Sequence, residues 1–462
     1  MRLALAGLAV GLALVGCAVR ADTTGGSPPT VVAPTAQPAP PTPTLAPSPQ
    51  KPAPPTPTLV PSKPTPAPSA PTPVAAKPTP MLLTPTAPPT ASAGPAGAAR
   101  VQLQVPDRYR IGRLAQPHEL TLPSGFTVSV FAAGLTGPRL MALGPDGTLY
   151  VTGMAGGVVY AMHDGGGVAD EVRAWASGLR RPHGIAVHDG YLYVGEENRV
   201  IRFKIGPNGE RASEPQIVVP DLPSGAGHAT RTVGFGPDGR LYVAVGSSCN
   251  VCLETDERRA AISVYGGDGG AGRLFARGLR NAVGLTWRPG TTQMWATNNG
   301  RDYLGDDAPP ETVYVVHEGL DAGWPRCNPP GTPDPQFGSP TSCQGVDAPA
   351  VTAQAHMAPL GLRFYDGKMF PPQLRGDLFV AFHGSWNRSV PVGYKVMRVP
   401  FGGGDKPIGP PEDFVTGFQP ADGSRGAVWA RPVDLLVMPD GAMLITDDDG
   451  GAIFRIAYAG AV

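Results

Sequence analysis

The chain repeats one short pattern of polar and apolar positions six times. Each copy is a turn, often containing Asp-Gly, followed by a run of apolar and β-branched residues, a pattern typical of a β-hairpin strand. Further strand-like runs, such as FTVSVFA, RVIRFKI and TVYVVHEG, lie between the copies, and almost no stretch has the 3.6-residue period of an amphipathic helix. The copies start at Gly144, His188, Gly236, Pro289, Arg375 and Met438.

Four-stranded units that recur at intervals of about 40 to 60 residues are typical of a β-propeller. The six copies therefore predict an all-β domain, a six-bladed β-propeller, within residues 101–462. The interval between the Pro289 and Arg375 copies is wide and rich in Pro and Gly, so we expect one blade to carry an insertion. One Asp-Gly turn alone would indicate only a turn, and a propeller architecture by itself says little about function.

The N-terminal segment has a different pattern. An apolar run over residues 3–15 follows one basic residue and leads to Cys17. The run is too short for a permanent membrane span and fits the apolar region of a secretory signal. Because LVGC at its end resembles a bacterial lipobox, we expect residues 1–16 to be a lipoprotein signal peptide and Cys17 to carry the lipid. The alternative is an ordinary signal peptide cleaved after Ala18 or Ala21.

A proline-rich segment follows. Residues 28–95 contain 25 prolines, three lysines and no acidic residue. Such a composition cannot bury enough apolar surface to offset the entropy of ordering, and it favours extended polyproline II. We therefore expect residues 17–100 to be a disordered stalk, with a ligand for proline-binding modules as the alternative. The protein is expected to be extracytoplasmic and lipid-anchored to the bacterial envelope.

Charge and motifs exclude several functional classes. Residues 101–462 contain 31 basic and 36 acidic residues, a formal net charge of −5, although the whole chain is neutral. This balance argues against a nucleic-acid partner. No GxSxG, no HExxH and no strand-to-helix GxGxxG occurs, so a serine hydrolase, a zincin and a nicotinamide dehydrogenase have no support. We expect a monomer that acts on a small molecule.

The domain contains four cysteines. The spacing of Cys327 and Cys343 does not fit a zinc site with Cys249 and Cys252, and Leu253 stands where a haem-attachment motif needs histidine. In an exported protein two disulfides are the default. The simplest pairing is Cys249–Cys252 and Cys327–Cys343, although four cysteines allow three pairings.

Polar residues gather between His228 and Pro325. The segments HATRTVGFGPDGRLYVAVGSSCNVC, ARGLRNAVGLTW, TNNGRDYLGDD and GWPRC place them beside short apolar strands, where loops on a rigid scaffold commonly form sites. His228 follows a Gly-rich turn at the head of a strand, a position that suits a general base. A single histidine is more often structural, and His356 and His383 are weaker candidates.

These segments resemble the glucose/sorbosone dehydrogenase family, and the resemblance covers nearly the whole of residues 120–458. The resemblance, in particular to the sorbosone branch, extends to the segments GLRRPHGIAVHDGYLYVGEENRVIRF, MAPLGLRFY and HGSWNR. Members of that family are six-bladed propellers that use pyrroloquinoline quinone (PQQ) and calcium. The resemblance implies a PQQ-dependent oxidoreductase that oxidises an aldose, a sorbosone-like aldehyde or a related sugar. The sequence identifies neither the sugar nor the electron acceptor.

The resemblance also implies roles for individual residues. His228 takes the place of the base that removes the hydroxyl proton, and Arg280 takes the place of the cation that stabilises charge on the quinone oxygen. Calcium would be held through Gly300, Arg301 and Asp302, with Asp306 and Asp307 as nearby acidic candidates. The residues implied to bind the cofactor, largely through its three carboxylates, are Arg231, Arg280, Asn281, Arg301, Arg388 and Arg431.

The chain departs from the glucose-oxidising members in ways that favour the sorbosone-like branch. Gly227 and Ser247 stand where those members carry acids, so the residue that orients His228 is left open. Arg301 replaces a proline, and the cofactor-binding lysine has no clear match, although Arg388 or His383 could substitute. Two other classes remain as alternatives. A calcium-dependent lactonase propeller would need a central metal held by carboxylates, and a non-catalytic binding propeller on the cell surface would leave the arginines dispersed.

Overall fold

The computed structural model describes residues 97–420 and 423–460, which are almost entirely strands and loops. The predicted signal peptide, Cys17 and nearly all of the predicted stalk lie outside these residues. The helices in the described part are single 3₁₀ turns, and none of them is long and apolar enough to cross a membrane. The prediction of an all-β domain is confirmed.

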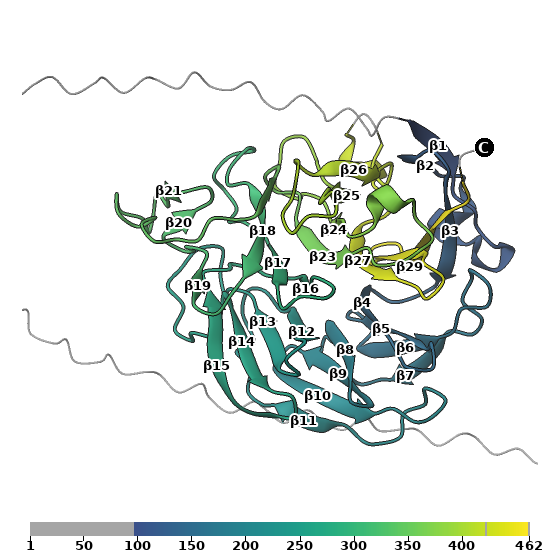
Figure 1. Cartoon of the computed structure of the whole chain (residues 1–462), viewed down its shortest axis with the longest axis horizontal. Coiled ribbons are helices and arrows are strands. Elements are labelled where there is room, and N and C mark those ends of the chain that lie inside the picture. The colour runs from purple at the N-terminus through teal and green to yellow at the C-terminus, as the bar shows by residue number, and fades with distance from the viewer. Residues whose placement is uncertain (1–96, 421–422, 461–462) are drawn as a thin grey trace, which may run out of the picture. The chain divides into compact units, whose positions relative to one another are not determined.

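The described strands form six antiparallel blades around an axis (Figure 1). Blade 1 contains β4 (Pro138–Leu143), β5 (Leu149–Gly153), β6 (Val158–Met162) and β7 (Arg173–Ala176). Blade 2 contains β8 (Gly184–His188), β9 (Tyr191–Glu196), β10 (Arg199–Lys204) and β11 (Gln216–Val219). Blade 3 contains β12 (Arg231–Phe235), β13 (Leu241–Val245), β14 (Ala261–Gly266) and β15 (Gly269–Arg277), with β19 (Leu320–Asp321) added in parallel.

Blades 4 to 6 complete the ring. Blade 4 contains β16 (Leu285–Trp287), β17 (Met294–Asn298), β18 (Glu311–Val316) and β22 (Val351–Ala353). Blade 5 contains β23 (Pro359–Phe364), β24 (Leu378–Phe382), β25 (Lys395–Val399) and β26 (Glu412–Val415). Blade 6 contains β27 (Pro432–Val437), β28 (Met443–Asp447), β29 (Ala452–Tyr458) and β3 (Phe126–Ala133). The prediction of six blades is confirmed.

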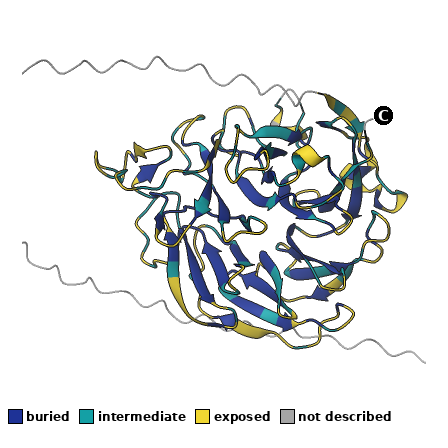
Figure 2. Cartoon of the chain, in the orientation of Figure 1, coloured by how far each residue is buried: buried dark blue, intermediate teal, exposed yellow. Residues whose placement is uncertain are grey.

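Each of the six sequence copies contributes the second strand of one blade. These strands are β5, β9, β13, β17, β24 and β28, and they are buried almost throughout because neighbouring blades cover both of their faces (Figure 2). The expected insertion lies in blade 4, between β18 and β22. It contains β20 (Cys327–Asn328), β21 (Thr332–Pro333) and the predicted disulfide between Cys327 and Cys343.

The ring is closed by strands from opposite ends of the domain. β3 pairs antiparallel with β29, so residues before blade 1 complete blade 6. Phe126 of β3 anchors this closure, since its ring packs edge-on against Phe370 and Phe414 at centroid distances of 4.8 and 5.3 Å. A separate hairpin-like pair, β1 (Ala98–Gln102) and β2 (Glu119–Pro123), precedes it.

Buried threonine hydroxyls join neighbouring blades near the axis. Thr446 donates to the Arg139 carbonyl at 2.7 Å, which links blade 6 to blade 1 at the point where β4 begins. A buried hydroxyl must find a partner, so each of these bonds fixes the relative position of two blades. Equivalent bonds run from Thr152 to the His183 carbonyl, from Thr232 to the Val283 carbonyl and from Thr297 to the Leu360 carbonyl.

Candidate active site

A cavity of about 410 Å³ opens where the six innermost strands begin. Its walls come from the loops that lead into these strands and from the loops between the second and third strands of the blades. In a propeller these two sets of loops lie on the same face, so every blade can contribute to one site. The titratable residues that line it are Arg139, Arg181, His228, Arg280, Asp302, Glu311, His356, His383 and Arg431.

The lining carries a positive balance of charge. Four arginines face two acids, and burial raises the pKa of one of them, Glu311, to about 7, so its carboxyl is partly protonated near neutral pH. Burial also lowers the pKa of His228 to about 4 and lowers that of His383. Both histidines are therefore neutral at pH 7. A partly enclosed, positively charged cavity of this size fits a small anionic ligand.

His228 is held with one ring nitrogen committed and the other free. Its Nδ1 lies 3.1 Å from both the carbonyl and the hydroxyl oxygen of Ser247. The Ser247 hydroxyl already donates to the Cys249 carbonyl at 2.6 Å, so it accepts from the ring. With two acceptors at Nδ1, the neutral ring carries its proton there. Among the described residues Nε2 has no hydrogen-bond partner, which leaves its lone pair available as a base.

Arg280 is fixed by oxygen acceptors on three sides. Its Nε donates to the Asn250 carbonyl at 2.9 Å, and its Nη2 donates to Asp302 at 2.8 Å and to the Asn250 side-chain oxygen at 3.0 Å. Its Nη1 donates to the Gly300 carbonyl at 2.6 Å. These bonds preorganise the guanidinium at the cavity wall, as electrostatic stabilisation requires.

The structure brings most of the predicted site residues together. His228, Arg280, Asn281, Gly300, Asp302 and Arg431 all line the same cavity. The three other arginines predicted to hold the cofactor do not line it. These are Arg231, Arg301 and Arg388.

Each of these three arginines has another partner. Arg231 is fully buried and donates to backbone carbonyls of the loop that carries His228, including His228 itself at 2.8 Å. Arg301 forms a buried ion pair with Asp334 of the insertion at 2.6 Å. Arg388 pairs with Asp307 at 3.1 Å. Their side chains therefore support loops around the cavity, which differs from the sequence-based assignment.

The oxygens assigned to calcium also have partners. The Gly300 carbonyl and the Asp302 carboxylate both accept hydrogen bonds from Arg280, and Asp302 accepts another from Asn387 at 2.6 Å. Calcium takes six to eight oxygen ligands. A calcium ion at this position would have to share its oxygens with a guanidinium cation, so this arrangement does not form an oxygen cage.

Two buried polar atoms at the cavity have no hydrogen-bond partner among the described residues. These are the side-chain oxygen of Asn281 and Nε of Arg139, on residues that are 7% exposed. Buried polar atoms are rarely left unpaired, so a polar ligand is expected to satisfy them. A planar, anionic quinone offers carbonyl and carboxylate oxygens that can accept from Nε of Arg139, and its ring N–H is a donor for the oxygen of Asn281, so the residues present fit PQQ in this respect.

Three of the titratable cavity residues were missed by the sequence analysis. Arg139 and Arg181 were not singled out, although each lies close to the start of an innermost strand, as Arg280 and Arg431 do. This recurrence was a usable signal. Glu311 gave no signal, because its role depends on burial. Its two carboxylate oxygens accept from Gly300 N at 2.8 Å and Ala358 N at 3.2 Å, so it joins two loops of the cavity.

His383 was a weak candidate by sequence and has a defined place in the structure. Its Nε2 lies 2.8 Å from Asp448, whose carboxylate also pairs with Arg139 at 2.6 Å. These contacts hold the pKa of Asp448 well below its usual range. The ion pair of Arg139 and Asp448, with neutral His383 hydrogen-bonded to Asp448, thus forms the wall of the cavity supplied by blades 5, 6 and 1.

The fold and the site define a six-bladed propeller with an arginine-lined cavity at one end of its axis. The sequence profile of the TrAA12-like family matches residues 120–317 and 333–459, and the chain belongs to this family. The gap between the matched segments falls in the blade 4 insertion.

The chain is also similar to individual proteins, one of them a named dehydrogenase. The chain is 28% identical over 354 residues to an uncharacterized protein of Borreliella burgdorferi, covering 73% of this chain and 91% of that protein. It is 27% identical over 406 residues to a pyrroloquinoline quinone-dependent pyranose dehydrogenase of Coprinopsis cinerea, covering 73% of this chain. That match spans 54% of the Coprinopsis protein's length. The predicted kinship with PQQ-dependent sugar dehydrogenases is confirmed.

Solved structures share the fold. The PQQ domain of the Coprinopsis cinerea pyranose dehydrogenase, in its holo form, matches with a TM-score of 0.65 and 23% identity, covering 77% of this chain and 98% of that domain. A calcium structure of a Trichoderma reesei carbohydrate-active enzyme of family AA12 matches with a TM-score of 0.62 and 22% identity, covering 73% and 96%. At these identities the likeness concerns the fold.

Proposed function

We propose that this protein is a PQQ-dependent oxidoreductase that oxidises a hydroxyl or aldehyde-hydrate carbon of a sugar in the axial cavity. The observation that carries the proposal is the convergence of His228, Arg280 and three further arginines on one cavity, in a chain of the TrAA12-like family. Pyranose dehydrogenase activity in the Coprinopsis relative supports a sugar as the substrate.

The chain's own cations and unpaired polar atoms would bind the cofactor. Arg139, Arg181 and Arg431 line the cavity and match the carboxylates of PQQ in charge. Arg431 donates from Nε and Nη2 to two backbone carbonyls at 3.1 Å, which fixes the plane of its guanidinium. Asn281 would use its unpaired oxygen toward a donor group, such as the cofactor's ring N–H.

His228 performs the proton transfer in this proposal. Its neutral ring presents Nε2 to the cavity, accepts the proton of the substrate hydroxyl, and becomes an imidazolium hydrogen-bonded through Nδ1 to Ser247. PQQ, when bound, supplies the electrophilic carbonyl carbon that takes the hydride. The low pKa of His228 keeps the base form populated at neutral pH.

Arg280 supplies a fixed positive charge beside the base. The guanidinium is buried and cannot reorient, so its field acts on negative charge that develops in the cavity without a reorganisation cost. We also expect calcium to bind with the cofactor, because the family that the sequence resembles uses both. No step in this proposal depends on calcium.

Two observations favour an oxidoreductase over the alternatives. A non-catalytic binding propeller gives no reason for four arginines to meet around a free histidine nitrogen in one cavity. A lactonase propeller needs a central set of carboxylate ligands. In residues 97–420 and 423–460, the sole cluster of three or more candidate metal-ligating side chains is Cys249, Cys252 and Glu254, two of which form a disulfide.

Reconstitution followed by turnover tests the proposal. The purified protein is loaded with PQQ, with and without calcium, and assayed for dye reduction with a panel of aldoses, pyranoses and aldehydes. We expect sugar-dependent reduction, and we expect His228→Ala to lose about 10²- to 10⁴-fold in kcat while still binding PQQ. A wild-type protein that binds PQQ but oxidises none of these substrates, or a His228→Ala variant with full turnover, would contradict it.

A further inference from the structure

The loop between β13 and β14 contains a four-residue ring, Cys249–Cys252, closed by a disulfide. We propose that this disulfide loop is a positioning element for the site, holding the ring of His228 with Nε2 free and the guanidinium of Arg280 at the cavity wall. The catalytic consequence of this positioning rests on the proposed function. Its structural content can be tested without turnover.

The first link runs from the loop to the base. The carbonyl of Cys249 accepts the hydroxyl hydrogen of Ser247 at 2.6 Å. Because that hydrogen is engaged, the lone pairs of the Ser247 oxygen face Nδ1 of His228 at 3.1 Å. Cys249 thus determines which way the serine hydroxyl points. The hydroxyl, together with the Ser247 carbonyl, determines which ring nitrogen keeps the proton.

The second link runs from the loop to the cation. Asn250, inside the ring, uses both of its oxygens on Arg280, with its carbonyl 2.9 Å from Nε and its side-chain oxygen 3.0 Å from Nη2. The same side-chain oxygen accepts from Asp302 N at 2.8 Å, and Nδ2 donates to the Asp302 carbonyl at 3.1 Å. Asn250 therefore fixes Arg280 and its carboxylate partner together.

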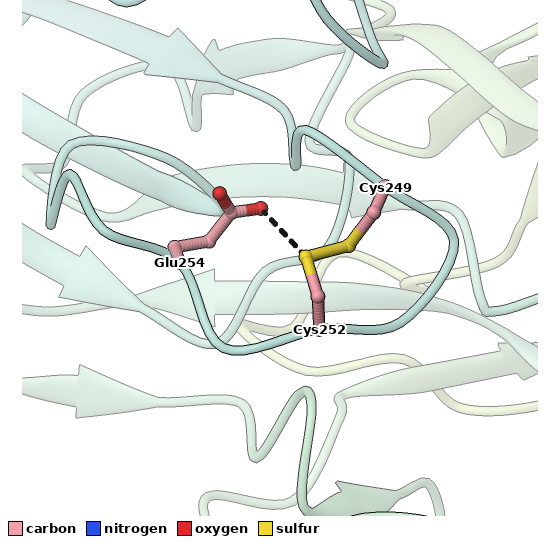
Figure 3. A group of neighbouring side chains, drawn as sticks. All are labelled: Cys249, Cys252 and Glu254. Atoms are coloured by element: carbon pink, nitrogen blue, oxygen red, sulfur yellow. Dashed lines mark hydrogen bonds between the residues drawn. A yellow bond between two sulfur atoms is a disulfide. The ribbon is translucent and has the colours of Figure 1, made fainter. Parts of the chain in front are cut away.

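Glu254 lies beside the disulfide, with its carboxylate directed toward the Cys252 sulfur (Figure 3). Glu254 accepts from Ser248 N and from the Ser248 hydroxyl, both at 2.7 Å. Its Oε1 lies 3.8 Å from the Cys252 sulfur, the contact drawn as a dashed line in Figure 3. A disulfide sulfur has neither a hydrogen to donate nor the thiolate that a metal would need, so this cluster fits a support better than a metal site.

The acceptors that hold the base and the cation both come from one short segment closed by a disulfide. The inference rests on this common origin. A cross-link restricts the backbone of the residues that it encloses, so the Cys249 carbonyl and both oxygens of Asn250 keep fixed directions. Opening the ring would release all three acceptors at once. The base would then sample both tautomers, and Arg280 would lose two of its partners.

The test compares two pairs of disulfides in the full protein. Cys249→Ser/Cys252→Ser opens the loop, and Cys327→Ser/Cys343→Ser, in the blade 4 insertion, is the matched control. In protein with ¹⁵N-labelled histidine, the ring signals of His228 are assigned by comparison with His228→Gln. We expect Nδ1 to be protonated and Nε2 bare in the wild type and in the control, and a mixture of tautomers in the opened loop.

Kinetics of the PQQ-loaded enzyme give the second readout. We expect kcat to fall about 10²-fold in the opened loop with KM nearly unchanged, since a reacting group displaced by about 1 Å loses that much. The control should lose less kcat than the opened loop, since its loop reaches the cavity wall only through the pair of Arg301 and Asp334. A point variant with the disulfide intact, Ser247→Ala, should change the His228 signals and lower kcat about 10-fold, the value of one hydrogen bond of this kind.

The outcomes separate this proposal from the proposed function. Wild-type ring signals in both the opened loop and Ser247→Ala would overturn the positioning role, whatever the enzyme does with sugars. If the opened loop fails to fold, the signals of Ser247→Ala decide alone. Changed ring signals in a protein that oxidises no sugar would support the positioning role and contradict the proposed function.

Discussion

At the scale of single residues, the environment of His228 explains a departure that the sequence left open. Relatives that oxidise glucose are expected to carry acids where this chain has Gly227 and Ser247. Here the ring is oriented by neutral oxygen atoms of Ser247, while burial and Arg280 keep the imidazole unprotonated. A base oriented without a carboxylate has a lower pKa, and this difference has consequences for the pH dependence of the protein.

The first prediction concerns stability in acid. The pKa of His228 is about 4 in the folded protein and about 6.5 when unfolded, so between these pH values the unfolded chain binds more protons. The free energy of unfolding should therefore fall as pH falls from 7 to 4.5, with roughly 2 to 3 kcal/mol of the loss due to His228. Denaturant unfolding at both pH values should show that His228→Gln lacks this part of the loss. The exposed His317→Gln is the control, and equal losses in all three proteins would contradict the account.

At the scale of secondary-structure elements, the sequence predicted local features better than distant ones. The six turn-and-strand copies predicted one strand in each blade because hairpin strands are encoded by short-range alternation and turn residues. The pairing of β3 with β29 could not be read in this way, since it joins segments more than 300 residues apart and depends on packing. The wide interval before the Arg375 copy predicted the insertion, although nothing in it indicated that Asp334 would capture Arg301.

The same distinction between local and distant features applies to the candidate site. His228, Arg280 and Asn281, which the sequence motifs singled out, all line the cavity because they lie just before innermost strands. They could not tell which arginine side chains point inward. Arg231 and Arg388 are turned toward nearby carbonyl and carboxylate oxygens, a matter of burial and rotamer choice.

Ring closure by β3 yields the second prediction. Phe126 is 4% exposed and packs against two aromatic rings of blade 5 and its neighbouring loop, so Phe126→Ala should lower the free energy of unfolding by about 3 to 5 kcal/mol. Ile217→Ala, on the edge strand β11 with a side chain 58% exposed, should change it by less than about 0.5 kcal/mol. Urea unfolding of both variants measures the difference. Similar small losses would show that β3 does not hold the ring closed.

At the scale of the whole molecule, we propose that the propeller is held at the bacterial envelope through a lipid on Cys17. The apolar run before this cysteine and the proline-rich segment after it support the proposal. Cys17→Ser should shift the protein from the membrane fraction to the soluble fraction of the expressing bacterium, since the lipid is the proposed anchor. Fractionation and immunoblotting check this. A wild-type protein that is already wholly soluble would contradict it.

The central claim, that the axial cavity binds PQQ through its arginines, is tested most directly by calorimetric titration of the protein with PQQ. Arg139→Gln and Arg431→Gln each remove a cavity cation, and Arg240→Gln removes a half-buried one outside the cavity that pairs with Asp238. We predict saturable binding to the wild type, a Kd at least about 10-fold weaker in each cavity variant, and an unchanged Kd in Arg240→Gln, since a charge-assisted hydrogen bond contributes about 1.5 to 3 kcal/mol. Absence of binding to the wild type, or equal Kd values in all four proteins, would contradict the account.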